Sequence, residues 1–285
     1  MNPLQSLLAE ATEVLSSSDD AGVWPRLDWL DRLDLHLLPG ERGADEITRR
    51  LHALRAVAES QNADLYASLR HAVIAGDRGR LAKLLAAHPA SGAADAAEGF
   101  DTRDDLIAGV LRLPTPGTAT QALAADEVAY QPTPVRHVLD LLQRTALGAD
   151  DVLLDLGAGL GQVALLAALL SPARACGIEI EPAYVASARQ SAAELGLRRA
   201  TFLCQDLAQT DLGEGTVFYL YTPLRGAAWT RLLERLRAEA ARRPIRLCGF
   251  GPCTLALRQA PWLRAVGQAQ AQAQAHRVAV FEARP

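Results

Sequence analysis

The chain has 285 residues, 49% of them hydrophobic, which is enough for two domains with substantial cores. A formal net charge of −4 argues against a nucleic-acid-binding surface, and no apolar run reaches the length of a membrane span. The N-terminal residues lack the basic leader and apolar core of a signal peptide, so we expect a cytoplasmic protein without membrane or nucleic-acid partners.

Residues 1–120 carry a largely helical pattern. Apolar residues recur every three or four positions from Leu4 to Leu15, from Ile47 to Val57, from Leu65 to Val73 and from Leu106 to Leu111. Small, acidic or turn-forming residues interrupt this pattern at 16–20, 39–40, 89–99 and 114–117. We expect an all-α region of about five helices over residues 1–120 and a second domain over residues 126–285.

An aromatic residue and two prolines open the second domain at Tyr130-Gln-Pro-Thr-Pro134, followed by a helical stretch from Val135 to Leu142. Because proline fixes φ, this segment can be simply a rigid turn. It can equally bring Tyr130 and Thr133 to a ligand, and both interpretations stay open.

The most informative stretch is Val152 to Gln162, which contains an apolar run, an acid and three glycines at alternate positions. Such glycines let a strand turn sharply and let the backbone approach a ligand closely. The next helix should begin near Gln162, with its free N–H groups facing the same pocket. A dinucleotide fingerprint, G-x-G-x-x-G, would need glycine at position 162, so the spacing disfavours an NAD site.

Further strands end in acids or polar residues. Residues 173–179 predict a strand ending in Glu179, about 20 residues beyond the glycines, where a carboxylate can accept ribose hydroxyls. Pro182 opens a helix that stops before Gly196. A third strand at 200–204 leads to Asp206, and a fourth at 216–221 leads to Thr222-Pro-Leu.

The remaining residues predict an arginine-rich helix at 229–242, whose charged face we expect in solvent, and a fifth strand at 244–249. Residues 268–275 alternate Gln and Ala, which suits a strand or a hairpin tip, and residues 276–281 predict a final strand. The four cysteines form no C-x-x-C pair, so we expect small buried hydrophobic residues and no metal site.

The series Asp155, G-x-G-x-G, Glu179 and Asp206 resembles class I methyltransferases that depend on S-adenosylmethionine (SAM). The resemblance covers residues 126–285 and implies SAM as cofactor. It also implies an α/β fold, with a Rossmann-like seven-stranded sheet that ends in a C-terminal antiparallel hairpin, beside the all-α N-terminal region. That region is then expected to shape the pocket of the methyl acceptor.

The same resemblance assigns roles to residues. The ribose is expected at Glu179 and the adenine amino group at Asp206, while the end of the fourth strand should face the methyl group. Tyr221 is then a candidate catalytic residue that orients an amine or a hydroxyl, although it can also pack in the core. The expected cofactor contacts are Tyr130, Thr133, Asp155, Gly157, Ala158, Gly159, Gly161, Gln162, Glu179, Ile180, Asp206, Leu207, Tyr221 and Thr222.

The acceptor stays open at this point. Tyr221-Thr-Pro-Leu departs from the Asn/Asp-Pro-Pro-aromatic signature of enzymes that act on amide or exocyclic base nitrogens. Tyr130-Gln-Pro-Thr-Pro134, the lead-in to the second domain, and Gly-Leu-Gly-Gln-Val163 are similar to segments in branches of lysine methyltransferases. This similarity favours a protein side chain as acceptor, whereas a closed pocket would favour a small molecule. A catalytically silent SAM-binding interaction module is the alternative function, and an NAD-dependent oxidoreductase is a distant third.

Overall fold

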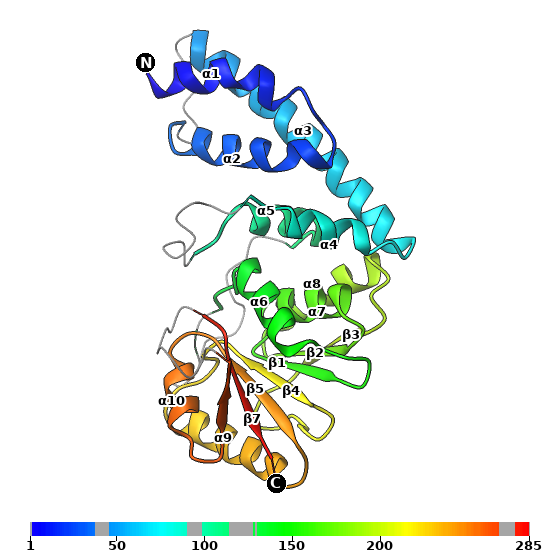
Figure 1. Cartoon of the computed structure of the whole chain (residues 1–285), viewed down its shortest axis with the longest axis vertical. Coiled ribbons are helices and arrows are strands. Elements are labelled where there is room, and N and C mark those ends of the chain that lie inside the picture. Colours follow the sequence, from blue (N-terminus) through cyan, green and yellow to red (C-terminus); the bar gives the residue numbers. More distant parts are fainter. Residues whose placement is uncertain are drawn as a thin grey trace. The chain divides into compact units, whose positions relative to one another are not determined.

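The structure is a computed structural model that describes residues 2–37, 46–89, 99–113, 128, 130–267 and 277–284. The chain divides into two compact units, one formed by Met1–Ala96 with Asp101–Leu111 and the other by Ala97–Phe100 with Arg112–Pro285 (Figure 1). The Gln/Ala alternation at 268–275 and the predicted break at 114–117 lie outside the described residues.

The first unit is helical. Its elements are α1 (Pro3–Val14), η1 (Asp20–Gly22), α2 (Val23–Asp34), α3 (Glu46–Ile74), α4 (Gly79–Ala86) and α5 (Thr102–Leu111). The apolar repeats at 47–57 and 65–73 both lie in the single long helix α3. Trp29 is fully buried in the core, and its ring N–H donates to the Leu7 carbonyl at 3.0 Å, so α1 and α2 are tied together by a satisfied polar contact.

The second unit is an α/β domain. Its helices are α6 (Val135–Thr145), α7 (Gln162–Leu170), α8 (Pro182–Glu194), α9 (Gly226–Ala240) and α10 (Cys253–Gln259). Its strands are β1 (Val152–Leu156), β2 (Arg174–Glu179), β3 (Ala200–Cys204), β4 (Val217–Leu220), β5 (Ile245–Gly249), β6 (Arg264–Val266) and β7 (Ala279–Ala283).

In the described part of the chain these strands form one seven-stranded sheet in the order β3-β2-β1-β4-β5-β7-β6. Strands β1 to β5 are mutually parallel, and β7 runs antiparallel to both β5 and β6. The predicted Rossmann-like sheet with a C-terminal antiparallel hairpin is therefore confirmed. The first strand of that hairpin is the short β6, which the sequence did not single out.

Helices cover both faces of the sheet: α6, α7 and α8 lie on one side, and α9 and α10 on the other (Figure 1). Helix α7 is buried from Gln162 to Leu169, as expected for a helix wedged between the sheet and its neighbours. Since the first five strands are parallel, their carboxyl ends meet at one edge, where ligands of open α/β sheets bind.

The structure also bears on the predicted burial of the cysteines and on the absence of a membrane span. Cys248 and Cys253 are buried and Cys176 is half-buried, but Cys204 is exposed because β3 is an edge strand, so the prediction of buried cysteines is wrong for Cys204. Within the described ranges, no helix combines the length and the apolar composition needed to cross a membrane.

Candidate functional site

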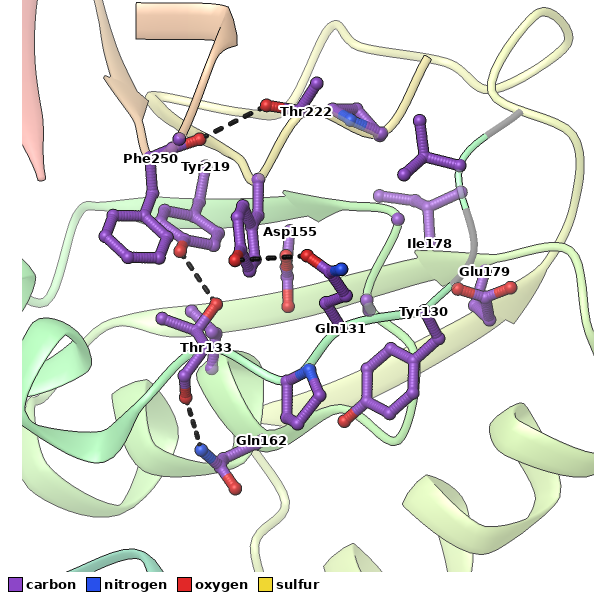
Figure 2. A pocket seen from close by; sticks show the side chains of 18 of the residues that line it. Tyr130, Gln131, Thr133, Asp155, Gln162, Ile178, Glu179, Tyr219, Thr222 and Phe250 are labelled. Atoms are coloured by element: carbon purple, nitrogen blue, oxygen red, sulfur yellow. Dashed lines mark hydrogen bonds between the residues drawn. The ribbon is translucent and has the colours of Figure 1, made fainter. Parts of the chain in front are cut away.

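A cavity of about 890 Å³ opens at the carboxyl ends of β1, β2, β3 and β4 (Figure 2). All of the sequence-predicted site residues line it except Gly159 and Gly161. Residues from the lead-in, from the glycine turn and from the ends of four strands are thus brought to one place, as the parallel topology requires.

The glycine turn between β1 and α7 requires glycine at two of its positions. At Gly159, where φ is +53°, an added Cβ would lie 1.9 Å from the Tyr130 ring. At Gly161, where φ is +80°, a Cβ would lie 2.5 Å from Phe202. These two glycines lie behind the lining side chains: the first lets Tyr130 pack on the turn, and the second lets α7 approach β3.

Glu179, at the end of β2, organises this turn. One carboxylate oxygen accepts the Gly159 N–H at 2.8 Å, and the other accepts the N–H groups of Ile180 and Glu181 at 2.9 Å each. A carboxylate has about four lone-pair sites, so the side chain can still accept a ligand hydroxyl. Glu179 therefore links the glycine turn to any ligand that it binds.

Asp155, on β1, faces the cavity from beneath and is only 3% exposed. Its Oδ2 atom is buried and has no hydrogen-bond partner. Burial, with a smaller contribution from the Glu179 charge, raises the pKa of Asp155 to about 8. A buried carboxyl group without a partner is costly, so this geometry suits a ligand that brings a positive charge or a hydrogen-bond donor.

The raised pKa of Asp155 predicts how stability depends on pH. The folded state holds the proton up to about pH 8, whereas an unfolded Asp loses it near about pH 4, so the free energy of unfolding should fall between these pH values. Asp155→Asn should flatten this dependence. Thermal melts of the ligand-free protein between pH 5 and pH 9 measure it; equal slopes for the wild type and the variant would contradict the assignment.

The lead-in is held by hydrogen bonds rather than by proline stiffness alone. The Gln162 amide donates to the Thr133 carbonyl at 2.7 Å, and the Thr133 hydroxyl lies 2.8 Å from the buried hydroxyl of Tyr219 (Figure 2). The ring of Tyr130 packs against Tyr184 with centroids 5.3 Å apart. Both Thr133 and Gln162 thus have protein partners and fix the wall of the cavity.

The end of β4 forms an aromatic corner. The Tyr221 ring packs on Phe250 at 4.6 Å, and its hydroxyl donates to Gln131 Oε1 at 3.3 Å. Thr222 has a φ of +44°, unusual for a β-branched residue, and its hydroxyl accepts the Cys253 N–H at 3.1 Å. This strained turn ties β4 to the start of α10 and fixes the direction of Tyr221.

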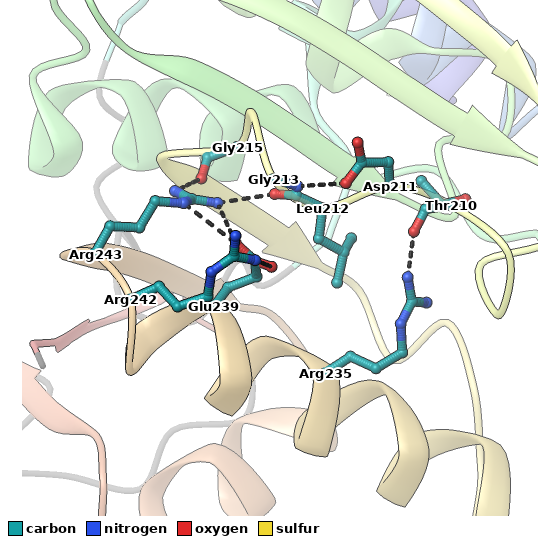
Figure 3. A network of polar contacts seen from close by, with 9 residues as sticks. All are labelled: Thr210, Asp211, Leu212, Gly213, Gly215, Arg235, Glu239, Arg242 and Arg243. Carbon is teal, nitrogen blue, oxygen red and sulfur yellow. Dashed lines mark hydrogen bonds and ion pairs between the residues drawn. The ribbon is translucent and has the colours of Figure 1, made fainter.

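Asp206 and Leu207 lie on the loop after β3. Arg235 of α9 and Arg243, in the turn after α9, bind backbone carbonyls of this loop (Figure 3). Arg235 donates to the carbonyls of Leu207, at 2.5 Å, and Thr210. Arg243 donates to the carbonyls of Leu212, at 2.9 Å, and Gly215, and it pairs with Glu239. The charged residues Arg231, Glu234 and Arg237 of α9 are exposed, whereas Arg235 contacts this loop and is an exception to the expected solvated face.

These contacts make Arg235 a positioning residue for the loop. Arg235→Gln removes two charged donors from backbone carbonyls, so we expect SAM, the cofactor that the sequence resemblance implies, to bind about ten-fold more weakly, corresponding to about 1.4 kcal/mol. Isothermal titration calorimetry measures the change. Arg237→Gln, an exposed neighbour on α9, is the matched control; equal affinities in the two variants would refute the role of Arg235.

Several residues that line the cavity were not predicted from the sequence. Tyr219 shares a face of β4 with Tyr221, since strand side chains alternate, and that period could have identified it. Phe250 and Pro252 follow β5 at the same sheet edge as the other sites. Gln131 gave no signal, because only the folded lead-in brings it opposite Tyr221.

The arrangement is suited to a nucleoside with a cationic substituent. Glu179 can accept hydroxyls, the exposed carboxylate of Asp206 can accept an amine, and Asp155 offers a buried acceptor without a partner. The cavity lies near the upper end of the range of ligand pockets, about 300–1,000 Å³, which leaves space for a second reactant.

Comparisons with known proteins place residues 153–243 in a family of methyltransferase domains. An RNA methyltransferase from Salinibacter ruber, solved with S-adenosylhomocysteine (SAH), is 30% identical over 53% of this chain and 92% of its own, with a TM-score of 0.40.

Magnesium protoporphyrin IX methyltransferase from Synechocystis PCC 6803, solved with SAM, is 21% identical over 52% of this chain and 76% of its own, with a TM-score of 0.38. The [4+2]-cyclase SpnF is 24% identical over 40% of this chain and 43% of its own, with a TM-score of 0.36. These similarities identify neither a substrate nor a mechanism. A comparison with curated proteins finds no match.

Proposed function

Since the α/β unit is a class I methyltransferase domain with SAM as its cofactor, we propose that it transfers a methyl group to an acceptor that enters beside Tyr221 and Phe250. In this proposal residues 126–285 are the catalytic domain and residues 1–120 an accessory helical region. The observation that carries the proposal is one continuous cavity that is lined by Asp206, Glu179 and Asp155 and reaches the aromatic corner.

The residues of this chain fit SAM on four counts. Asp206 would hold the adenine amino group, Glu179 the ribose and Asp155 a positive group, while the glycine turn provides a close backbone approach. SAM supplies a methyl group already activated on a sulfonium, so the protein mainly has to bind, orient and exclude water. Correct alignment of acceptor and methyl group is worth roughly 7–11 kcal/mol in such reactions.

The residues that line the cavity indicate which kind of acceptor fits it. Its acceptor end is formed by the rings of Tyr221 and Phe250 and by Pro223, Leu224 and Pro252. Such walls accept an apolar stem that carries a reactive group, either a small molecule or a long protein side chain. A catalytically silent SAM-binding module would share this cofactor site, and the departure at Tyr221-Thr-Pro-Leu is what keeps it as the second candidate.

Incubation with methyl-labelled SAM and fractionated lysate tests the proposal. We expect label to enter either a protein or a metabolite fraction. Retained SAM affinity with no label in any fraction would favour the silent module, and NADH binding without SAM binding would favour an oxidoreductase.

A further inference from the structure

Aromatic side chains gather in the cavity out of proportion to their number. The chain has five tyrosines, and Tyr130, Tyr184, Tyr219 and Tyr221 line this one cavity. Aromatic residues make up only 5% of the chain. The cavity therefore concentrates phenol groups and ring faces, which interact favourably with cations and with N–H donors.

Tyr221 is the member of this set at the acceptor end, and its position is fixed on several sides. Its ring packs on Phe250, which in turn packs on the buried His137 at 4.5 Å. An added Cβ at Gly251 would lie 2.9 Å from the Tyr221 ring, so the backbone closes tightly on it. The phenol oxygen is thus held towards Gln131, to which it donates at 3.3 Å.

The hydrogen bond between Tyr221 and Gln131 has a defined direction. A phenol, with a pKa near about 10, keeps its proton at neutral pH, and Tyr221 donates this proton to Gln131 Oε1 at 3.3 Å. The phenol oxygen retains lone pairs that can accept a further bond. Because hydrogen bonds in a chain polarise one another, an oxygen that is already donating becomes a better acceptor.

We propose that Tyr221 and Gln131 form a positioning pair that accepts the N–H group of a neutral amine, and that this amine nitrogen is the methyl acceptor. This inference rests on the proposed function. With one N–H directed to the phenol oxygen, the lone pair of the nitrogen is free to face the methyl group.

An amine suits this corner better than an alcohol. The nitrogen lone pair forms the new N–CH₃ bond while the C–S bond breaks and its electron pair goes to sulfur, and the product leaves as a methylated ammonium ion that exchanges its proton with solvent. A neutral amine needs no base before attack, whereas an alcohol does. Among the described residues, Gln131 is the hydrogen-bond partner of the Tyr221 hydroxyl, and an amide is no base.

The rings of the corner also favour an amine. The methylated product carries a positive charge until it loses a proton, and a cation within about 6 Å of a ring centroid gains about 0.5–2 kcal/mol. Tyr221 and Phe250 supply two such rings at the acceptor end. The developing charge is therefore stabilised where the reaction forms it.

Binding of the SAM analogue sinefungin tests the pair without knowledge of the acceptor, since sinefungin carries an amino group where SAM carries the transferred methyl. We expect wild type to bind sinefungin at least about ten-fold more tightly than SAH. Tyr221→Phe and Gln131→Leu should each reduce this ratio at least about three-fold, whereas Gln131→Glu should raise the ratio. Calorimetry gives both affinities.

Tyr66→Phe is the matched control, because Tyr66 is the one tyrosine outside the cavity lining. An unchanged ratio in both Tyr221→Phe and Gln131→Leu would overturn the inference. Failure of the wild type to bind SAH would instead overturn the proposed function, so the two failures are distinguishable.

Labelled SAM distinguishes two sources of the amine. Label in poly-L-lysine but not in 1-aminopentane indicates a protein side chain, and the reverse indicates a small molecule. Either result should show a rate that rises with pH as the amine, with a pKa near about 10.4, loses its proton. Label in 1-pentanol and in neither amine would contradict an amine acceptor.

Discussion

Gly159→Ala should abolish measurable binding of SAM and SAH, with a loss of at least about a hundred-fold, or about 2.7 kcal/mol. The new Cβ would lie 1.9 Å from the Tyr130 ring, so either Tyr130 must leave the cavity wall or the turn must shift. A shifted turn would also disturb the Gly159 N–H that Glu179 accepts. Calorimetry with both ligands measures the loss, and circular dichroism checks that the fold is kept.

Gly196→Ala is the matched control for backbone strain. Gly196 also has a positive φ, +63°, but an added Cβ there has nothing within 4 Å. Both substitutions carry the cost of a left-handed alanine, about 1–2 kcal/mol, and only the first places an atom in an occupied position. Comparable SAH affinity in the two variants would show that the Gly159 turn does not shape the cofactor site.

Glu179→Gln should also reduce SAM affinity about a hundred-fold. The carboxylate accepts three backbone N–H groups, whereas an amide offers one oxygen and directs its NH₂ group at a donor. One or two N–H groups of the turn would then lose their partner, at about 1–3 kcal/mol each, and the ribose would lose a charged acceptor. Titration with SAM gives the affinity, and thermal melts give the loss of stability.

Glu214→Gln provides the comparison. Glu214 is exposed and makes a 3.4 Å surface ion pair with Arg174, a type of contact that contributes little to stability. We expect wild-type affinity and stability in this variant. If Glu179→Gln behaved in the same way, the carboxylate would be only another solvated strand end.

The parts of the site that the sequence predicted are those encoded by local chemistry. A strand that ends in Asp155 and alternate glycines needs no distant residue to be recognised, since the turn itself demands glycine. Glu179 and Asp206 were found because parallel strands bring their carboxyl ends to one edge. Their spacing along the chain therefore already predicted a common pocket.

The parts that escaped prediction depend on contacts between distant segments. Gln131 and Tyr221 are 90 residues apart, and Arg235 reaches a carbonyl 28 residues away. A hydrogen bond from an arginine side chain to a backbone carbonyl cannot be predicted from the sequence, because every residue has such a carbonyl. For the same reason the contact between Arg235 and the loop could not be predicted from the arginine-rich pattern of α9.

The buried Oδ2 atom of Asp155, which has no hydrogen-bond partner, combines a feature that the sequence predicted with one that it did not. The acid can be recognised in the sequence, but only the packing of β1 between its neighbours shows that the Oδ2 atom of Asp155 is buried without a hydrogen-bond partner. Burial turns an ordinary strand-end acid into a group that favours a positive ligand. In the proposed function this property belongs to the cofactor half of the site, whereas the proposed acceptor half depends on Tyr221 and Gln131.

The most direct test of the account is calorimetric titration of the folded wild-type protein with SAM and with SAH. We predict one binding site for each ligand per chain, with both interactions lost in Gly159→Ala and retained in Gly196→Ala. A folded protein that bound neither ligand would contradict the assignment of this cavity as a SAM site.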